Sequence, residues 1–226
     1  DIPPVSKFDE LEVNRPELYY GELTDEFVVV NTDEEEFDYP SGEKNVYARY
    51  QGEGGVQLTN LWRKFLYGSK YGGTRFLLSG YPNNDSRIMF HRDIEERVQK
   101  LAPFLNFDDD PYIVLNEGRL YWIMDAYTTS GFYPYSEVFS SLERIGYKQG
   151  STNRNIYNQV SSNLQGQNYI RNSVKITVDA YSGKVDLYVF EEEDPLIQVY
   201  QRIFPELLKN KSEMPEGLRN HVRYPA

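Results

Sequence analysis

The sequence predicts an α+β fold in which an antiparallel sheet, built from two hairpins, carries helices packed on one face. The first observation is an internal repeat. Asp125-Ala126-Tyr127-Thr128 and Asp179-Ala180-Tyr181-Ser182 are near-copies of one tetrapeptide, and each lies in a stretch with strand-like alternation. The second observation is the order of elements, which runs helix, hairpin, spacer, hairpin and helix. Segments in this order pack economically as one sheet covered by helices.

The first hairpin is predicted over 112–127. Its strands, 112–115 and 119–127, flank the loop Asn116-Glu117-Gly118. A glycine at the third loop position supplies the left-handed residue of a three-residue hairpin loop.

The second hairpin is predicted over 174–189. Its first strand alternates four apolar residues with Lys175, Thr177 and Asp179, a pattern typical of a strand with one face toward water. The turn 181–183 ends in Gly183, and the apolar residues of 185–189 continue the buried face.

Three helices are predicted. The first covers 61–67, with Thr59 as its N-cap and four apolar residues on one face: Leu61, Trp62, Phe65 and Leu66. The second covers 86–105, with a break near Arg92 and a kink or stop near Pro103. The third begins with Asp194 as its N-cap and Pro195 in its first turn, bends near Pro205, and carries a stripe of Leu196, Val199, Tyr200, Ile203 and Leu207. Short strands are predicted over 27–30, 46–50 and 75–79.

The length of 226 residues suits one domain or two small lobes that share a core. We predict a loosely ordered arm over 1–18 and a single domain over 19–226. A polar spacer at about 143–168 is rich in Asn, Gln, Ser and Gly, so it is expected to be mobile, with one helical turn at 156–160. Because the chain begins at Asp1 without a methionine, we interpret it as a piece of a longer polypeptide.

Composition excludes several classes of function. The formal net charge of −11 repels phosphate backbones, so no nucleic-acid partner is expected. No apolar run approaches the roughly 20 residues of a membrane-spanning helix. The chain has no cysteine and two histidines, and it carries no recognisable nucleophile–base set, so no catalytic residue is assigned. The glycine-rich segment 52–55 lacks the Lys-Ser/Thr ending of a phosphate loop and is interpreted as a turn.

The candidate metal ligands are Asp108, Asp109 and Asp110, which precede Pro111. Hard cations such as Ca²⁺ bind several oxygen ligands from one loop. The spacing does not match a calcium-hand loop, and a solvated acidic loop is the alternative explanation.

The candidate recognition surface is the segment Gly131-Phe132-Tyr133-Pro134-Tyr135, which follows the first repeated tetrapeptide. Closely spaced aromatic residues on a loop can stack on sugars or anchor a protein partner, so Phe132, Tyr133 and Tyr135 are predicted to be exposed. A loop pinned onto its own sheet is the alternative. Asp125 and Asp179 could serve as the two acids of a hydrolase, or each could cap a turn or bind a neighbouring strand.

Several blocks of sequence resemble a known bacterial family, uncharacterised protein family 0182. The matching segments include Phe37-Asp38-Tyr39-Pro40-Ser41-Gly42, Phe107-Asp108-Asp109-Asp110-Pro111-Tyr112, Tyr121-Trp122-Ile123-Met124-Asp125-Ala126-Tyr127-Thr128 and Asn168-Tyr169-Ile170-Arg171-Asn172-Ser173-Val174-Lys175. The resemblance runs from about Tyr19 to the end of the chain. It implies a section of the water-soluble, extracytoplasmic portion of a large protein with several N-terminal membrane helices. The family has no assigned biochemical function, so the resemblance transfers no catalytic residues.

These observations lead to two hypotheses of different classes. The first is a non-catalytic extracytoplasmic interaction domain of a multi-pass membrane protein. Its partners would be the membrane-embedded part of the same polypeptide and an envelope protein, peptide or glycan. The second is a carboxylate-based hydrolase that acts on an extracellular polymer.

Overall fold

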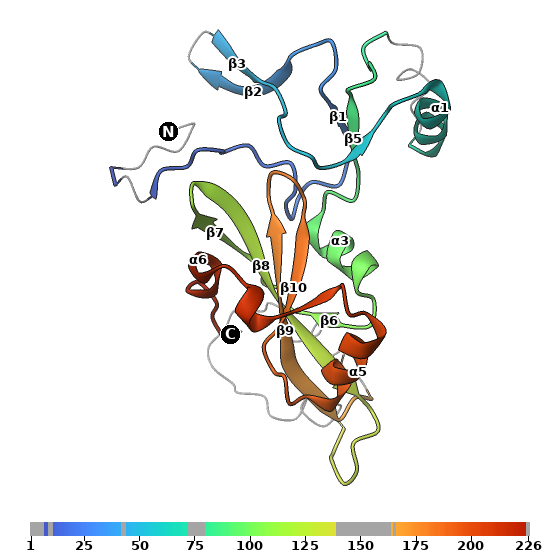
Figure 1. The fold of residues 1–226 in the computed structure, drawn as a ribbon, viewed down its shortest axis with the longest axis vertical. Helices are drawn as coiled ribbons and strands as arrows, with labels where there is room; N and C mark the ends of the chain where they lie inside the picture. The colour runs from blue at the N-terminus through green and yellow to red at the C-terminus, as the bar shows by residue number, and fades with distance from the viewer. Residues whose placement is uncertain are drawn as a thin grey trace, which may run out of the picture. The chain divides into compact units, whose positions relative to one another are not determined.

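Figure 1 shows the computed structural model of the chain, which describes residues 7–8, 11–41, 44–71, 80–138, 164 and 166–224. The chain forms two compact units, each described by itself below. Unit 1 comprises Asp1–Val98, Ile113–Trp122 and Val178–Val185, and unit 2 comprises Gln99–Tyr112, Ile123–Thr177 and Asp186–Ala226. Residues 19–226, which the sequence predicts as one domain, are shared between the two units.

The α+β class with antiparallel sheets is confirmed. The largest sheet has six strands in the order β11-β10-β9-β8-β6, with β7 also paired to β8. These strands are β6 (Asn106–Phe107), β7 (Tyr112–Asn116), β8 (Arg119–Ser130), β9 (Tyr169–Asp179), β10 (Val185–Val189) and β11 (Leu208–Asn210). The two predicted hairpins are therefore neighbours through β8 and β9. The strand β11 was not predicted, and it runs parallel to β10.

The turn of the first hairpin differs from the prediction. Strand β7 extends through Asn116, so two residues, Glu117 and Gly118, connect it to β8. Both have positive φ, 52° and 74°, as a two-residue type I′ turn requires. The expected three-residue loop was wrong because positive φ is adopted here by a glutamate as well as a glycine.

The predicted water-facing side of the second hairpin is also wrong. Lys175, Thr177 and Asp179 are buried together with the apolar residues between them. Strand β9 lies between β8 and β10, so it has no free edge. Its polar face is covered within unit 2 as well, where the carbonyl oxygen of Arg223 accepts a hydrogen bond from Lys175 Nζ at 3.2 Å.

Unit 1 contains two further small sheets. Strands β1 (Val28–Val30), β5 (Arg87–Met89) and β4 (Val56–Gln57) form a three-stranded antiparallel sheet in that order. Strands β2 (Glu36–Ser41) and β3 (Lys44–Ala48) form a separate ribbon. Part of the predicted loose arm is anchored in this unit, because the amides of Asn14 and Arg15 donate to the Gly118 carbonyl at 2.9 and 3.3 Å.

Helix α1 (Leu61–Lys70) begins at the predicted residue, but its N-cap is Asn60 rather than Thr59, because the Asn60 side chain accepts the capping hydrogen bond from the Arg63 amide. Its apolar face is exposed. Leu61 is 83% and Trp62 is 67% accessible among the described residues, and Trp62 stacks on Phe65 at 5.6 Å.

The helix predicted over 86–105 is a strand followed by a shorter helix. Residues Arg87–Met89 form β5, and α3 covers Ile94–Leu101. The chain changes direction at His91, which has φ 49°, and Asp93 then accepts a hydrogen bond from the Glu96 amide at 2.7 Å. The helix prediction was wrong over 87–89 because a short run of apolar residues does not distinguish a buried strand from a helix. The predicted stop near Pro103 is confirmed.

Helix α5 (Pro195–Ile203) has the predicted cap, because the Asp194 side chain accepts from the Leu196 amide at 3.0 Å. Its predicted stripe is wrong. Ile197 is the fully buried residue, whereas Val199 and Ile203 are about half exposed. The helix ends before Pro205 instead of bending there.

Some expectations fall outside the described residues. These are the strand over 75–79, the helical turn at 156–160 and most of the spacer at 143–168. Two very short helical elements, η3 (Lys211–Glu213) and α6 (Glu216–Arg219), follow β11 in the described part of the chain. No helix among the described residues is both long and apolar enough to cross a membrane.

Candidate functional site

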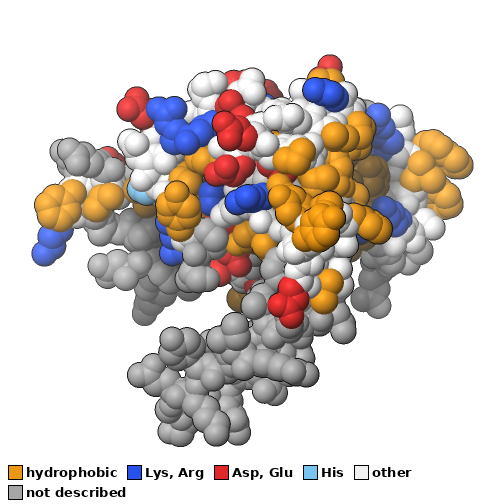
Figure 2. All heavy atoms as spheres, turned by 90° about the horizontal axis from the view of Figure 1, so that it is seen from below, with side chains coloured by type: hydrophobic (Ala, Val, Ile, Leu, Met, Phe, Trp, Pro, Cys, Tyr) orange, Lys and Arg blue, Asp and Glu red, His pale blue; other side chains and the backbone are white. Residues whose placement is uncertain are grey.

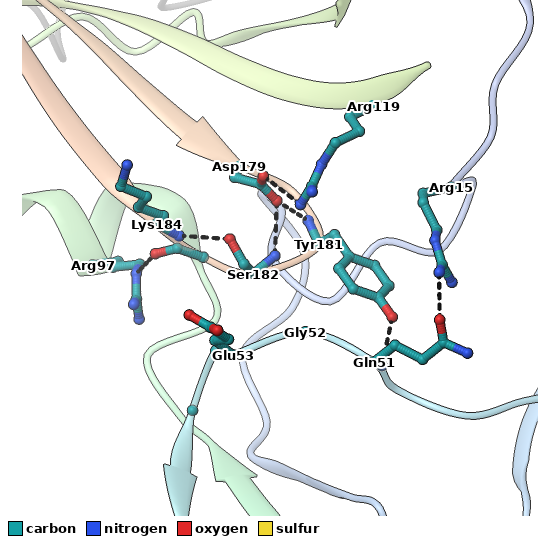
Figure 3. Close-up of a pocket in the computed structure, with 13 residues that line it drawn as sticks. Arg15, Gln51, Gly52, Glu53, Arg97, Arg119, Asp179, Tyr181, Ser182 and Lys184 are labelled. Carbon is teal, nitrogen blue, oxygen red and sulfur yellow. Dashed lines mark hydrogen bonds and ion pairs between the residues drawn. The ribbon is translucent and has the colours of Figure 1, made fainter. Parts of the chain in front are cut away.

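A cleft of unit 1 has a volume of about 710 Å³ and lies where the glycine-rich segment 52–55 meets the turn 181–184. Figure 3 shows the side chains that line it, with Arg15, Arg97 and Arg119 among them. Two acidic residues, Glu53 and Asp179, line the same cleft. The cleft is therefore a mixed-charge surface with an excess of guanidinium groups.

Asp179 stabilises the turn that forms one wall of this cleft. Its Oδ1 accepts hydrogen bonds from the amides of Tyr181 and Ser182 at 2.9 and 2.8 Å. Its Oδ2 pairs with the guanidinium of Arg119 at 2.7 Å. Both carboxylate oxygens are committed, so Asp179 caps a turn and binds the neighbouring strand, as the structural alternative predicted.

The arginines of this cleft are held mainly by unit 1 itself. Arg97 donates from Nε to the Gly183 carbonyl at 2.7 Å and lies over the Tyr20 ring at 4.7 Å. Arg15 donates to Gln51 Oε1 at 2.7 Å. These contacts commit the arginines to partners within unit 1, which limits what they can offer to a ligand.

Glycine is required in this cleft for close packing. A Cβ atom at Gly54 would overlap the Ser182 carbonyl oxygen, and one at Gly183, which has φ 70°, would overlap the Tyr20 ring. The predicted turn at 52–55 is thus packed closely against the hairpin tip, and this close packing accounts for the glycine at position 54.

Tyrosines form a buried cluster in unit 1. Tyr50 stacks on Tyr181 at 4.9 Å, and Tyr19 packs edge-on against both at 5.0 and 5.3 Å. Burial raises the pKa of Tyr50 to about 12, although the hydrogen bond from the Gly54 amide opposes the shift. Burial and the hydrogen bond to Glu36 also raise the pKa of Tyr19.

Asp125, the other predicted carboxylate, lies in unit 2 in a buried ion pair with Lys175. Asn172 Nδ2 donates to the same carboxylate at 3.0 Å. Burial lowers the pKa of Lys175 to about 8, and the Asp108 carboxylate opposes this shift. A carboxylate neutralised by a contacting ammonium is a poor general base, so Asp125 has a structural role.

The structure does not bring Asp108, Asp109 and Asp110 together as a metal site. Asp110 pairs with Arg223 at 3.0 Å. Burial raises the pKa of Asp108, and the charges of Asp109 and Asp110 raise it further. Across the described ranges, no group of three or more Asp, Glu or His side chains could hold Ca²⁺ or another metal ion.

The aromatic segment after β8 is a tightly held loop with exposed rings. Phe132 is 94% accessible, Tyr133 is 54% accessible, and Tyr135 is fully exposed with φ 60°. One side chain fixes the backbone. Asn168 Oδ1 accepts from the Tyr133 amide at 2.9 Å, and Asn168 Nδ2 donates to the carbonyls of Tyr133 at 2.8 Å and Ser136 at 3.2 Å. The Tyr133 ring stacks on Tyr169 at 5.4 Å.

Comparisons with known proteins identify the family. The model of an uncharacterised protein family, UPF0182, matches residues 1–226. The chain belongs to this family. Proteins named UPF0182 protein from Pelotomaculum thermopropionicum, Alkaliphilus metalliredigens and Salinibacter ruber are each 47% identical to it, over 225, 225 and 229 residues that cover the whole chain.

The chain spans about 22% of the length of these UPF0182 relatives. The predicted family resemblance is therefore confirmed, as is the prediction that related proteins are much longer. No solved structure matches the chain.

Sequence reasoning missed a second cleft, which lies in unit 2. It has a volume of about 690 Å³, and its lining includes five basic residues: Arg171, Lys175, Lys211, Arg219 and Arg223. They are spread over 53 residues of sequence without a motif, and three of them lie beyond residue 210. The overall composition, with a net charge of −11, does not indicate that these five basic residues lie in one cleft.

Proposed function

We propose that this chain is a non-catalytic, extracytoplasmic recognition domain of a multi-pass membrane protein, and that the aromatic loop 131–136 contacts its partner. The partner is an envelope protein, peptide or glycan. The location is supported by the resemblance to large membrane proteins with an extracytoplasmic portion. The much greater length of the UPF0182 relatives is consistent with a part of a larger polypeptide.

The observation that carries the proposal is that Phe132 and Tyr135 are exposed on a backbone that is already fixed. Figure 1 shows the loop beyond β8 at the lower end of the view, and Figure 2, which looks from below, shows hydrophobic side chains gathered on that end. Exposed aromatic rings cost solvation free energy and are enriched among the residues that dominate binding. Because Asn168 holds the loop, little conformational entropy would be lost on association.

The carboxylate-based hydrolase receives no support at the two carboxylates that suggested it. Asp125 is paired with Lys175 and Asp179 with Arg119, and the two residues belong to different units. A hydrolase that uses a carboxylate pair needs two free carboxyl groups at a set separation, one of them with a raised pKa. Nothing in the surroundings of these two residues provides that pair.

A double variant, Phe132→Ala with Tyr135→Ala, tests the proposal. Binding is measured to immobilised envelope glycans and, by photo-crosslinking, to envelope proteins. We expect at least about a tenfold loss of affinity, because truncating anchor rings typically costs more than 1 kcal/mol each. The melting temperature should change by less than about 2 °C, since neither ring is buried.

Leu23→Ala is the matched control, because Leu23 is 94% exposed in unit 1 and should affect neither binding nor stability. Unchanged binding of the double variant would contradict the proposal. A large loss of melting temperature would instead support the alternative in which the loop is pinned onto its own sheet.

A further inference from the structure

The cleft of unit 2 concentrates positive charge in an acidic chain. Five of its lining residues are Lys or Arg and one, Glu191, is acidic, whereas the whole chain has 24 basic and 35 acidic residues. Like charges brought together without counterions destabilise a fold. Such a grouping is therefore expected where a ligand neutralises it.

Two of the five cations are neutralised by carboxylates of unit 2. Lys175 pairs with Asp125 beneath the cleft, and Arg223 pairs with Asp110 at 3.0 Å. Arg223 also lies 4.0 Å above the centre of the Tyr112 ring. These two residues are part of the framework that builds the cleft.

The other three cations form no ion pair with a carboxylate of the described residues, and two of them are oriented by aromatic rings. Lys211 Nζ lies 4.7 Å above the Phe190 ring, and the Arg171 guanidinium lies 5.8 Å above the Tyr169 ring. Arg219, in the last turn of α6, makes no ion pair and no side-chain hydrogen bond with the residues that the structure describes. Contact with an aromatic face fixes a cation in place and leaves its full charge available.

The rest of the lining is suited to an organic group. Ile170, Phe190, Val222 and Tyr224 supply apolar and aromatic surface. Asn172 also lines the cleft, and its Oδ1 atom is buried without a hydrogen-bond partner in the described part of the chain. A buried acceptor without a donor is costly, so a hydroxyl group or a water molecule is expected beside it. The volume of about 690 Å³ lies within the range of small-molecule sites.

We propose that this cleft binds a phosphate group carried by a hydroxylated organic moiety, such as a sugar or glycerol phosphate. A phosphate monoester carries about two negative charges and three terminal oxygens, which suits a cleft lined by three cations that no carboxylate pairs. Arg171 and Arg219 supply planar donors for bidentate contacts, and Lys211 supplies a point charge. The inference is independent of the aromatic loop, since no residue of that loop lines the cleft.

Binding is tested on the 226-residue chain by calorimetry with sn-glycerol 3-phosphate, glucose 1-phosphate and inorganic phosphate. Neutral glycerol and glucose serve as negative ligands. We expect the esters to bind more tightly than inorganic phosphate, and we expect affinity to fall several-fold when the salt concentration rises from 50 to 300 mM. The variants Arg219→Gln and Lys211→Gln should each weaken binding about tenfold, with an unchanged circular dichroism spectrum.

Arg202→Gln is the matched control, because Arg202 is an exposed arginine of α5 in the same unit that does not line the cleft. A second arm uses vesicles of phosphatidylglycerol and of phosphatidylcholine. Binding to the first alone, lost in Arg219→Gln, also supports the proposal and identifies a lipid headgroup as the source of the phosphate. Absence of binding in both arms, or binding that Arg219→Gln and Lys211→Gln leave unchanged, overturns it.

Discussion

Replacing Asp194 by alanine should destabilise unit 2 strongly, because this buried carboxylate links a helix to two strands. Its Oδ1 accepts from the Leu196 amide at 3.0 Å and from the Tyr169 hydroxyl at 2.8 Å. Its Oδ2 accepts from the hydroxyls of Ser173 and Thr128, both of which are fully buried.

The magnitude follows from those contacts. Loss of the helix cap costs about 1 kcal/mol. The Thr128 and Ser173 hydroxyls, 3.1 Å apart, can still bond each other, so one buried donor is left with only the long 3.5 Å contact from Ser173 to the Arg171 carbonyl, at a cost of about 1–3 kcal/mol. Loss of the hydrogen bond from the Tyr169 hydroxyl adds about 1 kcal/mol. We expect a loss of about 3–5 kcal/mol in the free energy of unfolding.

Urea denaturation followed by circular dichroism is the suitable assay, because both tryptophans, Trp62 and Trp122, belong to unit 1. Asp194→Asn keeps a cap and should lose about half as much free energy. The exposed neighbour Glu193→Ala should change it by less than about 0.5 kcal/mol. A loss below about 1 kcal/mol in Asp194→Ala would refute the idea that the carboxylate holds this network together.

Acid provides a second readout of Asp194. Burial alone would raise the pKa of this carboxyl group, but the hydrogen bonds from Ser173, Thr128 and Tyr169 outweigh burial and lower it. A folded-state pKa below the unfolded value near 3.9 contributes stability that is complete above pH 4 and is lost as the pH falls through the folded value. Asp194→Asn should therefore flatten the acid limb of the stability curve.

Three further predictions concern other parts of the chain. Burial raises the pKa of Tyr50 from 10 to about 12. The contribution of the neutral Tyr50 hydroxyl to the free energy of unfolding is therefore present below pH 10 and falls by about 1.4 kcal/mol per pH unit as the pH rises to 12. Tyr50→Phe should reduce this slope in urea titrations. Gly183→Ala should cost about 2 kcal/mol or more, and Gly166→Ala, which has positive φ but open space around it, should cost about 1 kcal/mol in the same assay. Lys175→Met should cost about 3–5 kcal/mol by leaving the Asp125 carboxylate buried without a counter-charge, and adding Asp125→Asn should restore most of the loss.

These predictions have distinct failure points. Equal losses for the two glycine variants would show that space at the hairpin tip is unimportant. A double Lys175 and Asp125 variant no more stable than Lys175→Met would mean that the pair is not the source of the effect. An alkaline slope unaffected by Tyr50→Phe would assign the late titration to another tyrosine.

The amino-acid sequence by itself determined the local elements and the pairing of the two hairpins. Alternation of apolar residues identified β8, β9 and β10, and Asp194-Pro195 marked the start of α5, since caps and strand periodicity depend on neighbouring residues. Short apolar runs were ambiguous, which is why 86–105 was predicted as one helix.

Tertiary structure alone decided which faces are covered and which charges meet. The sequence pattern predicts that Lys175 faces water, whereas in the structure it contacts Asp125 and the Arg223 carbonyl. The pattern also predicts that Leu61 and Trp62 form a packing face, whereas both are exposed. The basic cleft of unit 2 joins residues from Ile170 to Tyr224. The physical reason is that the burial of a side chain and the electrostatic potential around it depend on all of its neighbours in space. Many of those neighbours are distant in sequence, so a local sequence pattern does not reveal them.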